Sequence, residues 1–222
     1  MLNWLRNLIC GLPFGALAMS QPAMACDTAL LLAIDVSSSI DAGEYRIQID
    51  GLADALLDPE VVDALVLGQS ALAVVQWSGV NKQGLVLGWD RMTSIEAVRA
   101  FSAQARSLPR AFFDSDTAIG DAIAFSARQF EDLADCNRRV IDVSGDGPQN
   151  AGSSAIIARQ SAEAQGIIIN GIAIESIGVA MTNYYKRTIV TRDGFVIRTR
   201  GHLEYPRAIR EKILRELAKA TG

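Results

Sequence analysis

The segment that most constrains the fold is LLLAIDVSSS, residues 30–39. Its opening apolar residues are followed directly by the carboxylate of Asp35 and the hydroxyls of Ser37, Ser38 and Ser39. An uninterrupted apolar run of this length predicts a strand that is buried on both faces of a parallel sheet. Side-chain oxygens are the ligands that a small, hard cation prefers. The segment therefore predicts a cation site at the edge of an α/β sheet.

Residues 1–25 have the layout of a secretory signal. Arg6 is their only charged residue, an apolar stretch follows from Leu8 to Met19, and the segment ends in the small-residue site Ala23-Met24-Ala25. The apolar stretch is short for a membrane span. We therefore expect a periplasmic or secreted mature chain that begins at Cys26 and has no transmembrane segment. The alternative is a retained amphipathic anchor, which does not account for the cleavage-like site.

Composition predicts one globular domain over residues 26–222. Hydrophobic residues make up 50% of the 222-residue chain, and no linker, repeat or low-complexity tract divides it. The formal net charge is −4, and it becomes about −5 once Arg6 is removed with the signal. This balance lacks the basic footprint of a nucleic-acid-binding protein.

Short β-rich runs alternate with helical patterns along the chain. We predict strands at 30–35, 70–77, 83–89, 138–144, 166–174 and 194–199, and helices at 41–57, 93–106, 118–133, 153–165 and 205–220. A Gly-Val-Asn-Lys turn joins the second and third strands, which predicts a hairpin with one antiparallel edge strand. The pattern as a whole predicts a doubly wound, Rossmann-like, mostly parallel six-stranded sheet with helices on both faces.

The two cysteines of the mature chain test this topology. Cys26 lies nine residues before Asp35, and Cys136 lies ten before Asp146. If the strands that end at these aspartates are parallel neighbours, the two thiols are within bridging distance at the other end of the sheet. We therefore predict a Cys26–Cys136 disulfide, which suits an exported protein. A lipid-modified Cys26 and two unpaired cysteines are the alternatives.

Three motifs together resemble the von Willebrand factor A (vWA) domain. They are DVSSS after the first strand, DTAIGDAI before a mid-chain helix, and VIDVSGDGPQN after a later strand. In that family an Asp-x-Ser-x-Ser sequence, a Thr and an Asp form the metal-ion-dependent adhesion site, or MIDAS. The residues that match these elements by position are Asp35, Ser37, Ser39, Thr117 and Asp146. The last residues of the chain and the SGDG turn look most like a bacterial family of exported A-domain proteins with no established function.

The resemblance implies a Mg²⁺, Mn²⁺ or Ca²⁺ ion with one coordination position open to a carboxylate of a partner protein. Local structure is the alternative, because serines and Thr117 are frequent helix caps and Asp146-Gly147 is a common turn. The occurrence of all three motifs at strand ends favours the cation site. Asp114 and Asp116 stand where vWA domains more often have a small residue, and they either add negative charge to the rim or point to solvent. Asp121 is expected to be a surface residue or a hydrogen-bond acceptor behind the ligands.

Enzymatic functions have less support. The only histidine, His202, is expected to be a surface or interface residue, and the chain has no GxSxG elbow, P-loop or zinc-ligand set. We therefore expect a non-enzymatic, cation-dependent protein-binding domain whose partner, unidentified by the sequence, presents an acidic residue. A Mg-dependent hydrolase or phosphoesterase that uses the same site is the alternative. The third hypothesis is a purely structural domain that binds no cation.

Overall fold

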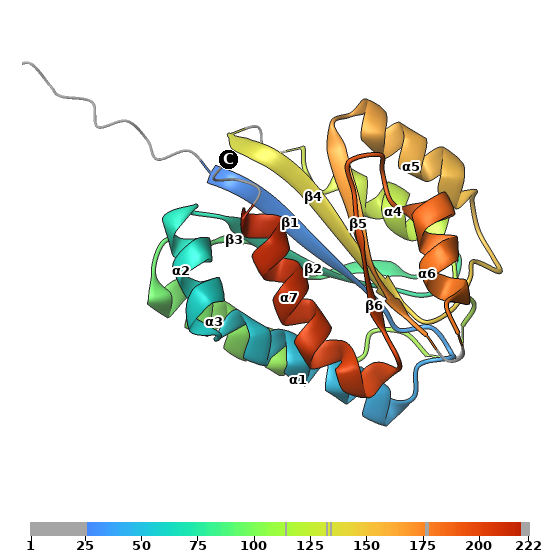
Figure 1. Ribbon diagram of the computed structural model, residues 1–222, viewed down its shortest axis with the longest axis horizontal. Coiled ribbons are helices and arrows are strands. Elements are labelled where there is room, and N and C mark those ends of the chain that lie inside the picture. The colour runs from blue at the N-terminus through green and yellow to red at the C-terminus, as the bar shows by residue number, and fades with distance from the viewer. Residues whose placement is uncertain (1–25, 114, 132, 134, 176–177, 219–222) are drawn as a thin grey trace, which may run out of the picture.

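The computed structural model describes residues 26–113, 115–131, 133, 135–175 and 178–218. The predicted signal at 1–25 and Asp114 lie outside these residues. The described chain forms a six-stranded sheet with strand order β3-β2-β1-β4-β5-β6 (Figure 1). Its strands are β1 Cys26–Asp35, β2 Ala71–Trp77, β3 Gln83–Arg91, β4 Cys136–Gly145, β5 Ile167–Ile174 and β6 Val196–Thr199. Only the β2–β3 pairing is antiparallel, so the predicted doubly wound sheet with one antiparallel edge strand is confirmed.

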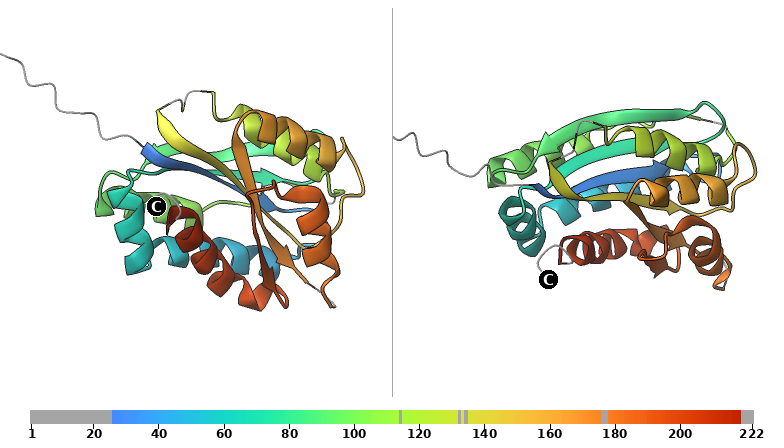
Figure 2. Two further views of the ribbon diagram at one scale, coloured as in Figure 1. Left: turned by 45° about the horizontal axis from the view of Figure 1, so that its top comes forward. Right: turned by 90° about the horizontal axis from the view of Figure 1, so that it is seen from above.

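Helices cover both faces of this sheet (Figure 2). One face packs against α1 Ala42–Leu56, α2 Pro59–Leu67, α3 Ile95–Arg106 and α7 Tyr205–Ala218. The other packs against α4 Ile119–Arg128, α5 Ala155–Ala164, α6 Ala180–Tyr184 and the π-helix η1 Tyr185–Ile189. A short 3₁₀ turn, η2 His202–Glu204, precedes α7. Two apolar cores result, one on each side of the sheet.

Helix starts follow local capping chemistry. Asp41 accepts a hydrogen bond from the Glu44 amide while the Glu44 side chain accepts one from the Asp41 amide, which is a capping box at the start of α1. Asp58 and Ser94 cap α2 and α3 through their own side chains. Because Asp41 caps α1, the hydroxyls of the preceding serines are not used for that purpose.

The predicted helix at 118–133 is too long, since α4 ends at Arg128. Beyond this residue the backbone tightens into turns, with the Gln129 amide donating to the Ser126 carbonyl. The Gln129 carbonyl is held from outside by the indole Nε1 of Trp89, at 2.7 Å, and the Trp89 ring packs on Phe130. The sequence pattern alone predicts that the helix continues beyond Arg128. Contacts with Trp89 of β3 end it earlier.

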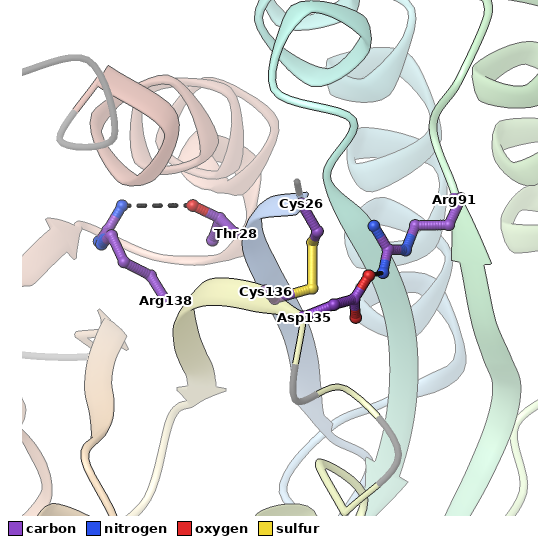
Figure 3. Close-up of a disulfide and its surroundings, with 6 residues drawn as sticks. All are labelled: Cys26, Thr28, Arg91, Asp135, Cys136 and Arg138. Atoms are coloured by element: carbon purple, nitrogen blue, oxygen red, sulfur yellow. Dashed lines mark hydrogen bonds and ion pairs between the residues drawn. A yellow bond between two sulfur atoms is a disulfide. The ribbon is translucent and has the colours of Figure 1, made fainter. Parts of the chain in front are cut away.

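The register of β1 and β4 brings the two cysteines together. Cys26 lies opposite Cys136 in the parallel pair, and their Cα atoms are 4.3 Å apart across a disulfide bond (Figure 3). The predicted disulfide is present, and it leaves no free sulfur for lipid attachment at Cys26. A crosslink spanning 110 residues adds about 5 kcal/mol in the chain-entropy model, only part of which is usually realised.

No helix in the described part of the chain is long and apolar enough to cross a membrane.

Candidate metal centre

The structure brings the five predicted ligands together at the carboxyl edge of the sheet. Asp35 ends β1, Ser37 and Ser39 lie in the turn after it, Thr117 precedes α4, and Asp146 follows β4. The Ser37 and Ser39 hydroxyl oxygens are 3.1 Å apart, and Ser39 Oγ donates to Asp146 Oδ1 at 2.6 Å. Thr117 Oγ1 lies 3.4 Å from Ser37 Oγ. Three loops that are far apart in sequence therefore converge on one cluster of oxygens.

Asp35 is buried with only half of its carboxylate satisfied. Oδ1 accepts the Ser37 amide at 2.7 Å, whereas Oδ2 has no hydrogen-bond partner. Burial raises the pKa of Asp35 to about 7, although hydrogen bonds from Ser37 oppose the shift. The guanidinium of Arg110 binds the carbonyls of Val36 and Ser37 instead of the carboxylate. A buried carboxylate oxygen without a partner fits a site for a cation.

Gly145 leaves open space beside this carboxylate. A Cβ at this position would lie 2.8 Å from Asp35 Oδ2 and 2.8 Å from the hydroxyl oxygen of Tyr185, so a larger residue would displace one of them. The Tyr185 hydroxyl is also buried without a partner, and burial raises its pKa well above the ordinary value, which keeps it protonated. Nothing in the sequence indicated that Tyr185 reaches this site.

The loop after β4 holds Thr117 in position. Asn150 Oδ1 accepts the Thr117 amide at 2.8 Å, and the Asn150 amide donates back to the Thr117 carbonyl. Gln149 Oε1 accepts the Gly120 amide in the first turn of α4, which has no side-chain cap from its own N-cap residue. The Thr117 hydroxyl therefore does not cap α4, and it remains directed toward Ser37.

The acidic residues near Thr117 have different roles. Asp116 is exposed to solvent, and its carbonyl accepts a hydrogen bond from Ser78. Asp121 accepts the Ser153 amide at 2.9 Å and thereby ties α4 to the loop after β4. Asp121 is therefore a hydrogen-bond acceptor, but it binds the loop after β4 rather than a predicted ligand.

His202 was expected to be a surface or interface residue, and the structure instead buries it within the chain. Its side chain is only 8% exposed, because η2 folds against α1 and Nδ1 lies 3.0 Å from Glu44 Oε1. Together with Asp146, Glu175 and Arg200 it lines a cavity of about 260 Å³ beside the cluster. Burial that depends on how a loop folds back on a distant helix leaves no signal in the local sequence.

This donor set suits a divalent cation that prefers oxygen. Three hydroxyls and two carboxylates supply at most two negative charges, and such a shell leaves positions for water or another oxygen ligand. In the part of the chain that the structure describes, no group of three His, Cys, Asp or Glu side chains forms an alternative metal site. A cation at this edge would therefore depend on the hydroxyls as well as on Asp35 and Asp146.

Comparisons with known proteins agree on the fold. Residues 25–221 match a family described as "Protein of unknown function (DUF1194)". No curated protein matches the sequence. A similar solved structure is proximal thread matrix protein 1 from the mussel byssus with a zinc-occupied MIDAS motif, with a TM-score of 0.61, 18% identity, and coverage of 87% of this chain and 48% of that one.

Two bacterial proteins have the same fold. A von Willebrand factor type A protein from Catenulispora acidiphila has a TM-score of 0.60 and 19% identity, covering 89% of this chain and 43% of its own. An aerotolerance-related membrane protein from Bacteroides fragilis has a TM-score of 0.54 and 20% identity, and the match covers 85% of this chain and 99% of that one. The chain thus spans about half the length of the first two structures, and the likeness shows that its fold is vWA-like.

Proposed function

The chain belongs to the DUF1194 family of unknown function and has a vWA-like fold, and from these premises we propose that it is an exported, cation-dependent protein-binding domain. In this proposal Asp35, Ser37, Ser39, Thr117 and Asp146 hold a divalent cation, with Mg²⁺ as the first candidate and Mn²⁺ and Ca²⁺ next. The cation in turn binds a carboxylate of a partner protein.

The observation that carries the proposal is the unpartnered Oδ2 of Asp35 in a cluster of hydroxyls. A buried carboxylate oxygen without a partner destabilises the protein unless a cation or a hydrogen-bond donor satisfies it. Mg²⁺ requires near-octahedral oxygen coordination and retains several waters, so a site with only five oxygen-bearing residues leaves room for an external ligand. The mussel protein with a zinc-occupied MIDAS has the same fold, which supports a cation at this edge.

Apolar side chains around the cluster favour a protein partner. Val80 follows β2, Phe113 lies in the loop that leads to Thr117, Val179 follows β5 and Leu203 follows β6, so all four extend from the carboxyl edge of the sheet. All are exposed, with Phe113 at 62% and Leu203 at 86% of their full accessibility. Apolar groups around a charged centre are characteristic of interfaces between proteins. A small polar substrate would gain little from them.

Cation titration tests the first half of the proposal. Isothermal titration calorimetry with Mg²⁺, Mn²⁺ and Ca²⁺ is expected to show one site in the wild type and none in Asp35→Ala. Asp116→Ala is the matched control, because it removes the same charge from an exposed neighbour of Thr117. Wild-type protein that binds none of the three cations would overturn the proposal in favour of a structural domain.

A peptide array tests whether the bound cation binds a carboxylate of a partner protein. Peptides with a single Asp or Glu are compared with copies that carry Asn or Gln, in Mg²⁺ and in EDTA. We expect capture that requires both the carboxylate and the cation and that disappears in Asp35→Ala. If instead the protein hydrolyses a phosphoester such as p-nitrophenyl phosphate, and Asp35→Ala abolishes the turnover, the site is that of a hydrolase and the binding proposal fails.

A further inference from the structure

A basic cleft lies away from the candidate metal centre. It is formed by α5, η1, the segment that leads into β6, and α7, and its volume is about 630 Å³. Because it lies where β6 begins, whereas the predicted cation ligands lie where strands end, the two sites are at opposite ends of the parallel strands. The cleft shares no residue with the candidate metal centre.

Cationic side chains dominate the lining of this cleft. Arg159, Lys186, Arg192 and Arg215 contribute four positive charges, and among the described residues that line it Glu163 is the one acid. Oε1 of Glu163 accepts the Arg192 backbone amide at 2.9 Å, so this carboxylate fixes the backbone of the cleft. Four positive charges in one cavity are notable in a chain with a formal net charge of −4. Such local excess attracts anions.

Two of the three guanidinium groups are positioned by contacts with groups other than carboxylates. Arg159 Nη1 donates to the Arg187 carbonyl at 2.9 Å, while its buried Nε has no partner. The guanidinium carbon of Arg215 lies 3.9 Å from the centre of the Phe195 ring. Against these four cations the described lining of the cleft holds one carboxylate, that of Glu163. Two of its guanidinium groups are therefore held in place, and its lining keeps an excess of positive charge.

These features select the chemical class of the ligand. The planar fork of a guanidinium matches pairs of phosphate oxygens, and three of the four cations are arginines. A single carboxylate would balance one of the four charges, whereas two phosphates balance most of them. The volume is in the range of pockets that hold small organic ligands, well beyond that of one phosphate ion. We propose that this cleft binds a ligand with at least two phosphate groups, either a soluble polyphosphate or the phosphorylated head group of a lipid.

Calorimetry with inorganic tripolyphosphate tests the cleft directly. EDTA is present throughout, so that a cation at the other site does not contribute. We expect saturable binding to the wild type, and at least a tenfold weaker affinity in Arg159→Gln and in Arg215→Gln. Arg128→Gln is the matched control, because Arg128, like Arg215, is exposed and lies over an aromatic ring (Phe125, 5.7 Å), and it lines no part of this cleft. Thermal melts confirm that each variant is folded.

Two results would overturn the proposal. One is the absence of saturable binding at millimolar tripolyphosphate, and the other is an equal loss of affinity in Arg128→Gln, which would indicate an unspecific charge effect. Both can occur while the cation titration of the wild type succeeds, so this test is independent of the proposed function.

Vesicle sedimentation then separates the two sources of phosphate. Phosphatidylcholine vesicles are doped with a phosphoinositide that carries several phosphates, or with phosphatidylserine at equal total charge. Cleft-dependent sedimentation with the phosphoinositide alone assigns the ligand to a lipid head group, and binding of tripolyphosphate without sedimentation assigns it to a soluble anion. Equal sedimentation with both lipids would contradict recognition of phosphate.

Discussion

Two buried aspartates on neighbouring strands differ in the charge beside them. Asp142, in β4, lies 2.9 Å from the ammonium of Lys212, which is itself fully buried in α7. Asp35, at the end of β1, forms no salt bridge with a described residue. Its Oδ2 has no hydrogen-bond partner, and the same is true of both carboxylate oxygens of Asp142, so the difference between the two lies in the charge of Lys212. Burial raises the pKa of both, to about 6 for Asp142 and to about 7 for Asp35, and the charge of Lys212 limits the rise at Asp142. The protein supplies its own cation to one carboxylate and leaves the other available to an external one.

The ammonium of Lys212 beside Asp142 also neutralises the charge of a second buried acid. Lys212 Nζ lies 2.7 Å from Glu216 Oε1, and Asn170 Nδ2 donates to both oxygens of Glu216. Asn170 in turn accepts the Phe195 amide at 2.7 Å. This buried cluster therefore links α7 to the middle of the sheet and to the segment before β6.

Lys212→Met is the most disruptive test of this difference. It leaves two buried carboxylates without a counter-charge, and we expect the free energy of unfolding to fall by about 3–5 kcal/mol. Urea denaturation at pH 7 measures the loss. Lys186→Met removes the same charge from an exposed position and is expected to change stability by less than about 0.5 kcal/mol. Similar losses in the two variants would mean that the buried ion pair does not stabilise α7 on the sheet.

The pH dependence of stability provides the next test. Because the pKa of Asp142 is raised from 3.8 to about 6, the folded protein retains a proton between these pH values that the unfolded chain has released. The contribution of this group to stability is complete below pH 4 and is lost as the pH rises through 6, by at most about 3 kcal/mol. Asp142→Asn removes this contribution.

Urea titrations of wild type and Asp142→Asn at pH 4, 5, 6 and 7 in EDTA check the sign. The stability of the wild type relative to the variant should decrease along this series. A difference that stays constant with pH would show that Asp142 is already ionised at pH 4, with Lys212 fully compensating its burial.

The role of Asp35 could be predicted from the sequence, whereas the buried ion pair of Asp142 could not, and the reason is physical. Asp35 lies where a buried strand ends, and the cysteine offsets placed that strand beside the one before Asp146, as the register confirms. Asp142 lies inside an apolar strand, and Lys212 and Glu216 are spaced like an ordinary exposed pair on a helix. Only the docking of α7 on the sheet determines that these charges are buried together. The burial of His202 and the position of Tyr185 beside Asp35 were missed for the same reason, since both depend on distant packing.

Asp35→Asn tests the second aspartate of the comparison, the one without a lysine beside it. In EDTA at pH 8 the variant should be more stable than the wild type by about 1–2 kcal/mol, because a buried carboxylate without a counter-charge becomes neutral. Added Mg²⁺ should then raise the melting temperature of the wild type but not that of the variant. Asp116→Asn, at an exposed position, should leave both measurements unchanged. A large loss of stability in metal-free Asp35→Asn would indicate that the protein itself already compensates this charge.

Two buried tyrosines extend the comparison to uncharged groups, where the smallest effect is expected. Tyr45 donates to the Leu108 carbonyl at 2.8 Å and accepts from Gln76, whereas the Tyr185 hydroxyl beside Asp35 has no partner. Tyr45→Phe should therefore lower the free energy of unfolding by about 1–2 kcal/mol, and Tyr185→Phe should change it by less than about 0.5 kcal/mol in EDTA. Urea denaturation of the two variants measures both values. A loss in Tyr185→Phe as large as that in Tyr45→Phe would show that the polar groups at this edge are satisfied without a cation.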